Sequence, residues 1–275
     1  MAELVVRGAR VHYQGLGQKL GQGESPVVFL HGLVMDNLSS WYFTLANPLA
    51  TRRGVLLYDL RGHGKSERTP GGYRVPELVA DLAALLDALG HPEGPVDLVG
   101  NSFGGLLALA FAMAHPERAG RIVLVDAQLC DEEWVAGMGR TLGLEGAERD
   151  RQIAESFRHW LGRHSDRKRN RLATNARELV YGTSLVADLA ASPTFDDREL
   201  ARLGSPVLAL YGEQSDVRSS GEKLARLAPR CELEIFPGCS HSILWEATDR
   251  LRARVLGWLA PVRAQGSPGA GGAGG

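Results

Sequence analysis

The chain has 275 residues, of which 44% are hydrophobic and 23% charged, and its formal net charge is -1. This composition is typical of a globular protein that can bury a large core, so a mainly disordered chain is excluded. Because the net charge is close to zero, no global field attracts nucleic acid, an anionic membrane or a polyanionic substrate.

The first elements are predicted to be strands. Residues 4–7 and 10–14 flank Gly8 and resemble an antiparallel hairpin. Short apolar runs bounded by Gly, Pro or Asp then recur along the chain, and such runs suit strands buried on both faces of a parallel sheet. These six further strands are predicted at 27–30, 55–58, 96–99, 122–125, 207–211 and 233–236.

Helical patterns lie between these strands. The clearest covers residues 76–89, where leucines and a valine recur at helical spacing behind Pro76, a residue suited to the first turn of a helix. The repeated succession of strand and helix predicts an α/β fold with a doubly wound sheet.

The strongest chemical signal follows the strand at 96–99. Gly100-Asn101-Ser102-Phe103-Gly104 is a G-x-S-x-G motif that lies after an apolar strand and before an apolar helix. In this context the turn is strained and holds the serine hydroxyl exposed at the start of the helix. We therefore predict that Ser102 is a nucleophile.

The alternation of strand and helix breaks between about residues 128 and 204. This segment carries amphipathic, charge-rich helical patterns and no convincing strand, so we expect a helical insertion over one end of the sheet. The predicted organisation is a core in two parts, 1–127 and 205–262, with the insertion at 128–204. Residues 263–275 are rich in Gly and are predicted to form a disordered tail.

Side chains that can activate the serine follow the last two predicted strands. His241 lies in the loop after the strand at 233–236 and is the predicted general base, because this loop projects from the edge of the sheet where Ser102 lies. A buried carboxylate must orient the imidazole. Asp216, after the strand at 207–211, is the predicted acid, with Asp126 and Glu213 as alternatives. His31 and His63 are interpreted instead as braces of Gly-flanked loops.

A tetrahedral intermediate also needs backbone amides directed at its oxyanion. The amide of Phe103, directly after the nucleophile, is the first predicted donor. The second is the amide of Leu33, because His31-Gly32 turns the chain back tightly after the strand at 27–30.

Features of an exported or membrane-spanning protein are absent from the sequence as given. The N-terminus lacks a basic segment followed by an apolar run, and no stretch of about 18 apolar residues occurs. The three cysteines are too few and too unevenly spaced for a disulfide framework or a zinc site. We therefore expect reduced thiols and a cytoplasmic location, and no metal site.

These motifs, in this order, resemble the α/β-hydrolase superfamily over about residues 3–260. They are strand-His31-Gly32, the 59–66 loop, the motif around Ser102, Gly212-Glu213-x-x-Asp216 and the loop of His241. The likeness is greatest to single-domain esterases, cofactor-free haloperoxidase-type esterases and hydrolases of meta-cleavage products. It implies an eight-stranded, mostly parallel sheet with a lid inserted after the sixth strand, and a catalytic triad of Ser102, Asp216 and His241.

The predicted function is hydrolysis of a carboxylic ester or thioester of a hydrophobic small molecule, without a cofactor. Met35, Trp41 and Trp245 are predicted to line an apolar substrate pocket with Leu33 and Phe103. Serine at the nucleophile position argues against dehalogenases and epoxide hydrolases of this superfamily, which use a carboxylate. The same triad would also serve C-C bond hydrolysis, a lyase reaction, or acyl transfer and cyclisation of a polyketide-like chain. A non-catalytic ligand receptor is the remaining alternative, and the oligomeric state is left open.

Overall fold

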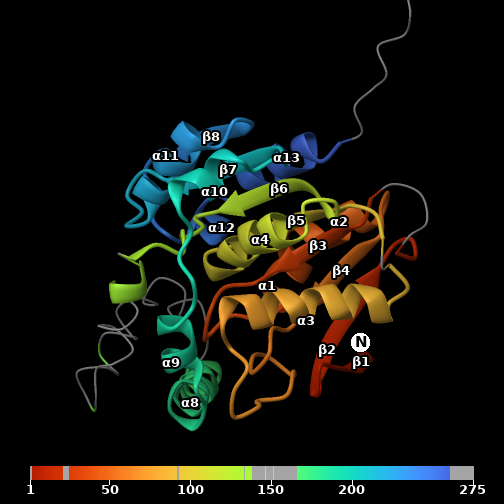
Figure 1. Cartoon of the computed structure of the whole chain (residues 1–275), viewed down its shortest axis with the longest axis vertical. Coiled ribbons are helices and arrows are strands. Elements are labelled where there is room, and N and C mark those ends of the chain that lie inside the picture. Colours follow the sequence, from red (N-terminus) through yellow and green to blue (C-terminus); the bar gives the residue numbers. More distant parts are fainter. Residues whose placement is uncertain are drawn as a thin grey trace, which may run out of the picture.

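The computed structural model describes residues 2–20, 25–91, 93–132, 134–137, 146, 151 and 166–260. A single sheet of eight strands forms its centre (Figure 1). The strands are β1 (Ala2–Val6), β2 (Ala9–Leu16), β3 (Val27–Leu30), β4 (Val55–Tyr58), β5 (Val96–Asn101), β6 (Ala119–Val125), β7 (Val207–Gly212) and β8 (Cys231–Phe236). They lie in the order β1-β2-β4-β3-β5-β6-β7-β8. β2 pairs antiparallel with β1 and β4, and the pairings from β4 to β8 are parallel.

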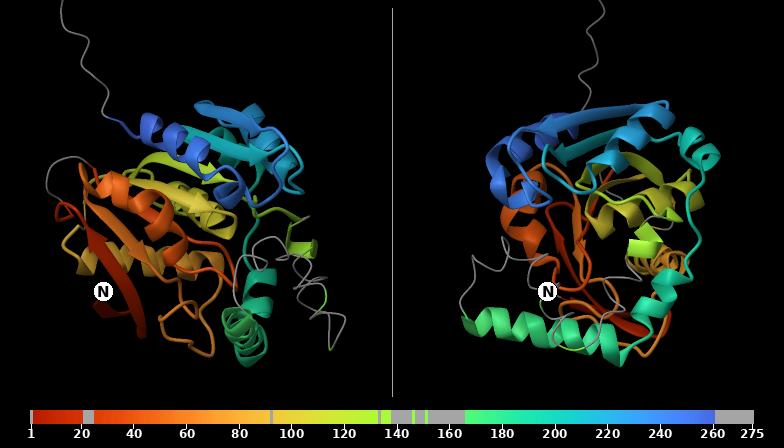
Figure 2. Two further views of the ribbon diagram at one scale, coloured as in Figure 1. Left: turned by 180° about the vertical axis from the view of Figure 1, so that it is seen from behind. Right: turned by 90° about the vertical axis from the view of Figure 1, so that its left-hand side faces the viewer.

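Helices cover both faces of the sheet (Figures 1 and 2). One face is covered by α3 (Val75–Ala88), α4 (Phe103–Ala114), α10 (Asp197–Ala201) and α11 (Arg218–Leu227). The other face is covered by α1 (Ser39–Trp41), the π-helix η1 (Tyr42–Ala46), α2 (Asn47–Ala50), α12 (Ile243–Glu246) and α13 (Thr248–Trp258). Two helices, α8 (Asp166–Gly182) and α9 (Leu185–Ala190), lie beyond one end of the sheet.

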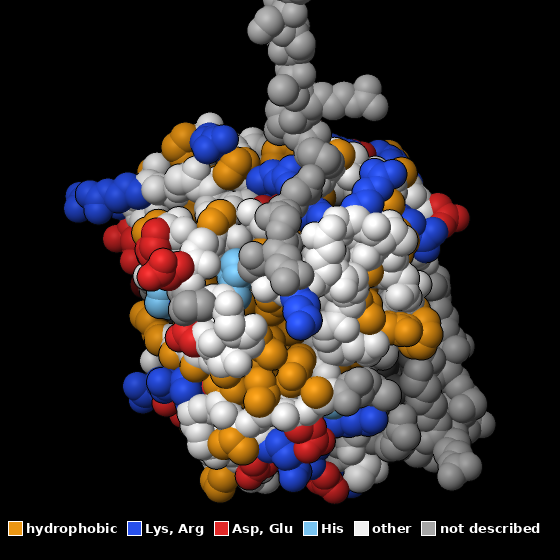
Figure 3. Space-filling view, turned by 90° about the vertical axis from the view of Figure 1, so that its right-hand side faces the viewer, with side chains coloured by type: hydrophobic (Ala, Val, Ile, Leu, Met, Phe, Trp, Pro, Cys, Tyr) orange, Lys and Arg blue, Asp and Glu red, His pale blue; other side chains and the backbone are white. Residues whose placement is uncertain are grey.

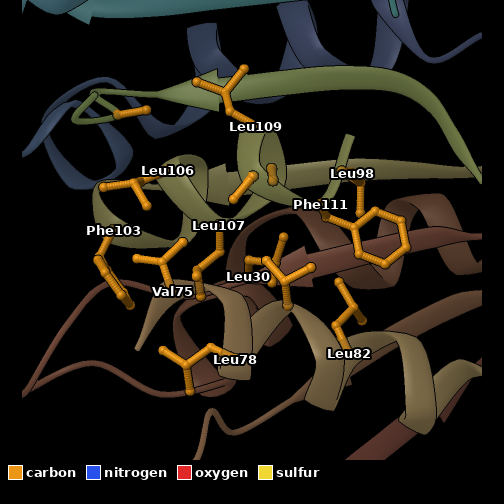
Figure 4. Packing of buried hydrophobic residues seen from close by; sticks show 14 of the residues in the cluster. Leu30, Val75, Leu78, Leu82, Leu98, Phe103, Leu106, Leu107, Leu109 and Phe111 are labelled. Atoms are coloured by element: carbon orange, nitrogen blue, oxygen red, sulfur yellow. The ribbon is translucent and has the colours of Figure 1, made fainter. Parts of the chain in front are cut away.

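The strands feed two hydrophobic cores because successive side chains of a strand point to opposite faces. In β3, Val28 and Leu30 pack under α3 and α4, whereas Val27 and Phe29 pack under η1 and α13. Figure 4 shows the first core from close by, with leucines of α3 and α4 meeting over the sheet. Both faces of the central strands are therefore buried, which is why their sequences are continuously apolar.

The predicted fold class is confirmed: the sheet has eight strands, is mostly parallel and is flanked by helices. β3 and β4 have the predicted ends, and the helix predicted at 76–89 is α3. It begins one residue earlier, where the Glu77 carboxylate accepts a hydrogen bond of 3.0 Å from the Arg74 amide and so caps the first turn. No helix in the described ranges is both long and apolar enough to cross a membrane.

The segment predicted as an insertion lies between β6 and β7, and the elements described within it are helices. Its C-terminal part is hydrogen-bonded to the start of α3 and to the chain just before it. Asp188 of α9 accepts a hydrogen bond of 3.0 Å from the Tyr73 amide, and the Ser192 hydroxyl accepts one of 3.0 Å from the Val75 amide. Much of 133–165 and the predicted tail at 263–275 lie outside the described residues. A lid function for 128–204 stays a prediction.

Candidate active site

The turn between β5 and α4 positions Ser102 through an unusual backbone. Ser102 has φ 52° and ψ -118°, a conformation that residues with a side chain rarely adopt. The turn is also tightly packed, because a Cβ at Gly100 would lie 2.4 Å from the carbonyl of Gly104 and a Cβ at Gly104 would lie 2.2 Å from the Leu30 carbonyl oxygen. The two glycines of the motif are thus required by close approach of the backbone, and the strain is localised at the serine.

Replacing Gly104 with Ala is expected to destabilise the fold severely. The new methyl group would overlap the backbone of β3, which cannot move without breaking the sheet, so we expect a loss of about 3 kcal/mol or more in the free energy of unfolding. Gly204→Ala is the matched control, because a Cβ there has nothing within 4 Å. Denaturant titration followed by circular dichroism measures both. Equal stability of the two variants would contradict this account of the turn.

His241 reaches the serine from the loop between β8 and α12. Its Nε2 lies 3.1 Å from Ser102 Oγ, within hydrogen-bonding distance. Burial lowers the pKa of His241 and the neighbouring Asp216 carboxylate raises it, with a net pKa below the usual value. The neutral imidazole is therefore favoured at neutral pH, and its Nε2 can accept the serine proton.

Asp216 lies beside this histidine but is not the buried carboxylate that the sequence analysis expected. Its Oδ1 is 3.8 Å from His241 Nδ1, which is longer than a hydrogen bond, and its side chain is 84% exposed. His241 Nδ1 is itself buried and has no hydrogen-bond partner among the described residues. A shift of about 1 Å in the loop before α11 would close this gap, since hydrogen bonds of catalytic groups are often long in unliganded proteins.

The two alternative acids support loops instead of contacting the histidine. Glu213 Oε2 accepts a hydrogen bond of 2.9 Å from the Gly238 amide. Asp126 is fully buried under the turn that leads to Asp216, where its Oδ1 accepts a hydrogen bond of 3.1 Å from the Gly212 amide. Its Oδ2 has no partner in the described chain. Burial, with a smaller effect of the Asp216 and Glu246 carboxylates, raises the pKa of Asp126 to about 7.

Around Leu33, in the loop after β3, three backbone amides are hydrogen-bonded within the described chain and that of Leu33 is not. The Gly32 amide donates to Asp36 Oδ2 at 2.8 Å, and the Met35 amide donates to the Leu33 carbonyl at 2.8 Å, closing a γ-turn at Val34 with φ 66°. The Val34 amide donates to His63 Nε2 at 2.8 Å. The amide of Leu33 makes no hydrogen bond within the described part of the chain, and neither does that of Phe103.

His31 and His63 brace loops, as the sequence analysis interprets them. His31 Nε2 accepts a hydrogen bond of 3.0 Å from the Leu60 amide, and its Nδ1 lies 2.7 Å from the Gly32 carbonyl. His63 Nδ1 lies 2.8 Å from the Arg61 carbonyl, while its Nε2 accepts the Val34 amide. Burial lowers the pKa of His63 to about 3, so this ring stays neutral and remains an acceptor at ordinary pH.

Of the residues predicted to line a pocket, Trp41 and Trp245 belong to one hydrophobic core. Trp41 is fully buried in the core under η1, with its ring centroid 5.1 Å from that of Phe29 and its Nε1 donating to the Leu30 carbonyl at 2.9 Å. Its ring is buried in the core, and its assignment to a substrate pocket stays a prediction. Trp245 is half-buried against the same core, and Met35 is buried.

Trp134, in the segment predicted as an insertion, lies against the nucleophile turn. Its ring is stacked on Phe103 at 6.1 Å between centroids, and its Nε1 donates to Gln128 Oε1 at 2.6 Å. Helical spacing could have marked Trp134 as buried. Its contact with Phe103 could not be inferred from the sequence, because it depends on how the insertion folds back onto the sheet.

Metal-ligating side chains and surface charge are the next features of the described part of the chain. In the described ranges, no group of three or more His, Cys, Asp and Glu side chains could hold a metal ion. On the face shown in Figure 3, basic and acidic side chains are interspersed and neither sign forms a continuous field.

Comparisons with known proteins agree with this architecture. The family model described as alpha/beta hydrolase fold matches residues 25–248. A 2-hydroxymuconate semialdehyde hydrolase of Pseudomonas putida is 30% identical over 78% of this chain and 79% of its own. A 3-oxoadipate enol-lactonase of Acinetobacter baylyi is 27% identical over 78% of this chain and 82% of its own.

A solved structure shares the fold over nearly the whole chain. The meta-cleavage product hydrolase of Pseudomonas fluorescens superposes with a TM-score of 0.77, covers 94% of this chain and 97% of its own, and is 23% identical. The match of the family model includes the turn of Ser102 between β5 and α4 and the loop of His241 between β8 and α12. The chain therefore belongs to the alpha/beta hydrolase fold family and is an enzyme of that type.

Proposed function

We propose that the protein is a serine hydrolase that cleaves a carboxylic ester or thioester of a hydrophobic small molecule through an acyl-enzyme. The observation that carries this proposal is the contact of 3.1 Å between Ser102 Oγ and His241 Nε2. A serine hydroxyl needs a base at this distance to become a nucleophile.

The reaction proceeds in two steps. Ser102 Oγ attacks the carbonyl carbon as its proton passes to His241 Nε2, and the tetrahedral intermediate collapses to the acyl-enzyme. The leaving alcohol or thiol takes that proton from the imidazolium. Water then gives a proton to His241 and attacks the acyl carbon, and the returning proton restores Ser102 as the carboxylic acid departs.

The free backbone amides support the assignment of the oxyanion donors. Leu33 and Phe103 are the predicted donors, and three neighbouring amides of the loop after β3 are already hydrogen-bonded elsewhere. Donors that are already held in place stabilise a developing oxyanion without reorganisation. Asp216 is proposed to fix the imidazole once the loop before α11 closes on the histidine.

The apolar contact between Phe103 and Trp134 supports a hydrophobic acyl group. The stacked rings lie directly beside the nucleophile turn and are buried, with Trp134 8% exposed. The proposal includes residues 128–204 as the lid that supplies this wall, and a cytoplasmic location, which is compatible with three free cysteines.

A second candidate is hydrolysis of a C-C bond next to a ketone. The names of two relatives favour it, because a 2-hydroxymuconate semialdehyde hydrolase and a meta-cleavage product hydrolase cleave C-C bonds of ring-fission products. The enol-lactonase favours the first candidate, since a lactone is a cyclic ester. The same serine, base and amides serve both reactions.

A substrate panel separates the two candidates. We expect the protein to hydrolyse p-nitrophenyl esters and the matching thioesters, with kcat/KM rising roughly threefold per methylene from acetyl to hexanoyl as apolar surface is buried. 2-Hydroxymuconate semialdehyde, followed by loss of its absorbance, is the C-C test. Turnover of that compound without ester hydrolysis would overturn the first candidate. Failure with every substrate and with a fluorophosphonate probe would overturn the serine mechanism itself.

A further inference from the structure

The Asp36 carboxylate lies between the loop after β3 and the nucleophile turn. Its Oδ2 accepts a hydrogen bond of 2.8 Å from the Gly32 amide and one of 3.3 Å from Asn101 Nδ2. Gly32 directly precedes the proposed donor Leu33, and Asn101 directly precedes Ser102. One carboxylate oxygen therefore joins the residues adjacent to the oxyanion donor and to the nucleophile.

The other oxygen holds the carboxylate in place. Asp36 Oδ1 accepts a hydrogen bond of 2.8 Å from the Asn37 amide and another from the hydroxyl of Ser40, which lies in α1. Four donors thus converge on a half-buried group that has about four lone-pair sites. The Asp36 carboxylate therefore has no acceptor site left for a hydrogen bond from a substrate, which is consistent with a positioning role.

We propose that Asp36 is a positioning residue that sets the Leu33 amide relative to Ser102. The inference rests on the proposed serine mechanism and deepens it. The γ-turn at Val34 is strained, since a β-branched residue has a positive φ, and such a conformation persists only where neighbouring contacts fix it. Asp36 anchors the loop before this turn and His63 anchors the turn itself, so loss of Asp36 leaves one of the two anchors.

A carboxylate suits this position better than an amide. Asn has one acceptor oxygen, and its NH2 group would face two of the four donors. Asp36→Asn keeps the volume of the side chain and removes half of the contacts, while Asp36→Ala removes them all. The two variants therefore form a graded series at one position.

The experiment measures catalysis per functional site. Asp36→Ala, Asp36→Asn and the wild type are titrated with a fluorophosphonate, and kcat and KM are measured with p-nitrophenyl butyrate. Inhibition by an alkyl trifluoromethyl ketone, which forms a tetrahedral adduct on the serine, is the second readout. Ser39→Ala is the control, because Ser39 lies in the same segment and its hydroxyl makes no hydrogen bond in the described chain.

We expect Asp36→Ala to lower kcat per site by about 10² and to raise the inhibition constant of the ketone by a similar factor, because one oxyanion donor is misplaced. KM should stay within about threefold, and Asp36→Asn should be intermediate. Unchanged kcat per site and unchanged ketone inhibition, with only a lower melting temperature, would overturn the proposal. If Asp36→Ala does not fold, the same criteria apply to Asp36→Asn. A wild type that neither labels nor hydrolyses esters would instead overturn the proposed function.

Discussion

Ser102→Ala is expected to lower kcat for ester hydrolysis by on the order of 10⁶, to the level set by the oxyanion donors and binding alone. Without Oγ no acyl-enzyme forms, and His241 Nε2 loses its contact of 3.1 Å. Fold stability should change little, because the hydrogen bond that Ser102 Oγ makes in the described chain is to a half-buried imidazole and the strained backbone remains.

Two measurements check this prediction. Turnover of p-nitrophenyl butyrate gives the change in kcat, and intact-protein mass spectrometry shows whether a fluorophosphonate still adds to the chain. Ser219→Ala is the matched control, because Ser219 is exposed on α11, away from the β5-α4 turn. Wild-type rates or covalent labelling in Ser102→Ala would mean that another residue is the nucleophile.

The sequence was most informative where residues close together in the chain determine the local structure. β3 and β4 are continuous apolar runs with clear ends, so a strand buried on both faces was the simplest interpretation and the structure has it. The turn around Ser102 could be predicted for a similar reason. Its glycines are required because a Cβ at Gly100 or Gly104 would lie 2.2 to 2.4 Å from neighbouring backbone atoms.

Contacts between distant loops could not be predicted in this way. Trp41 has the same local sequence whether its ring packs in the core or faces a ligand. Its position was decided by Phe29 and the Leu30 carbonyl, which are brought to it by the sheet. The Asp36 contact with Asn101 likewise spans 65 positions of the chain. Asp216 was predicted as the acid from its position along the chain, between Ser102 and His241. The order of residues gives no information on how exposed the Asp216 side chain is in the fold.

Asp216→Asn is expected to lower kcat by about 10³ to 10⁴, because the imidazole loses the carboxylate that orients it and stabilises its positive form. The pH dependence should also change. Asp216 is the group that raises the pKa of His241 against the effect of burial, so its removal lowers that pKa further. The acid limb of kcat/KM should therefore move to lower pH in this variant, since that limb reports the base of the free enzyme.

Asp126→Asn is the matched comparison, and its effect should fall on stability. An amide oxygen can still accept the Gly212 amide, so turnover should change much less. The pKa of Asp126 is about 7 in the fold, against 3.8 when unperturbed. The native state therefore binds the proton more tightly, and this group weakens the fold increasingly from about pH 4 to pH 7. Asp126→Asn removes that loss and should be more stable than the wild type at pH 8, by on the order of a few kcal/mol.

The two readouts together decide which carboxylate is the acid. A loss of turnover and a shifted acid limb in Asp216→Asn, with a gain in stability at high pH in Asp126→Asn, would mean that the exposed aspartate acts on the histidine and the buried one only supports its loop. Comparable loss of turnover in a correctly folded Asp126→Asn would reverse the assignment. In that case the buried carboxylate, and not the one 3.8 Å from His241 Nδ1, would be the acid.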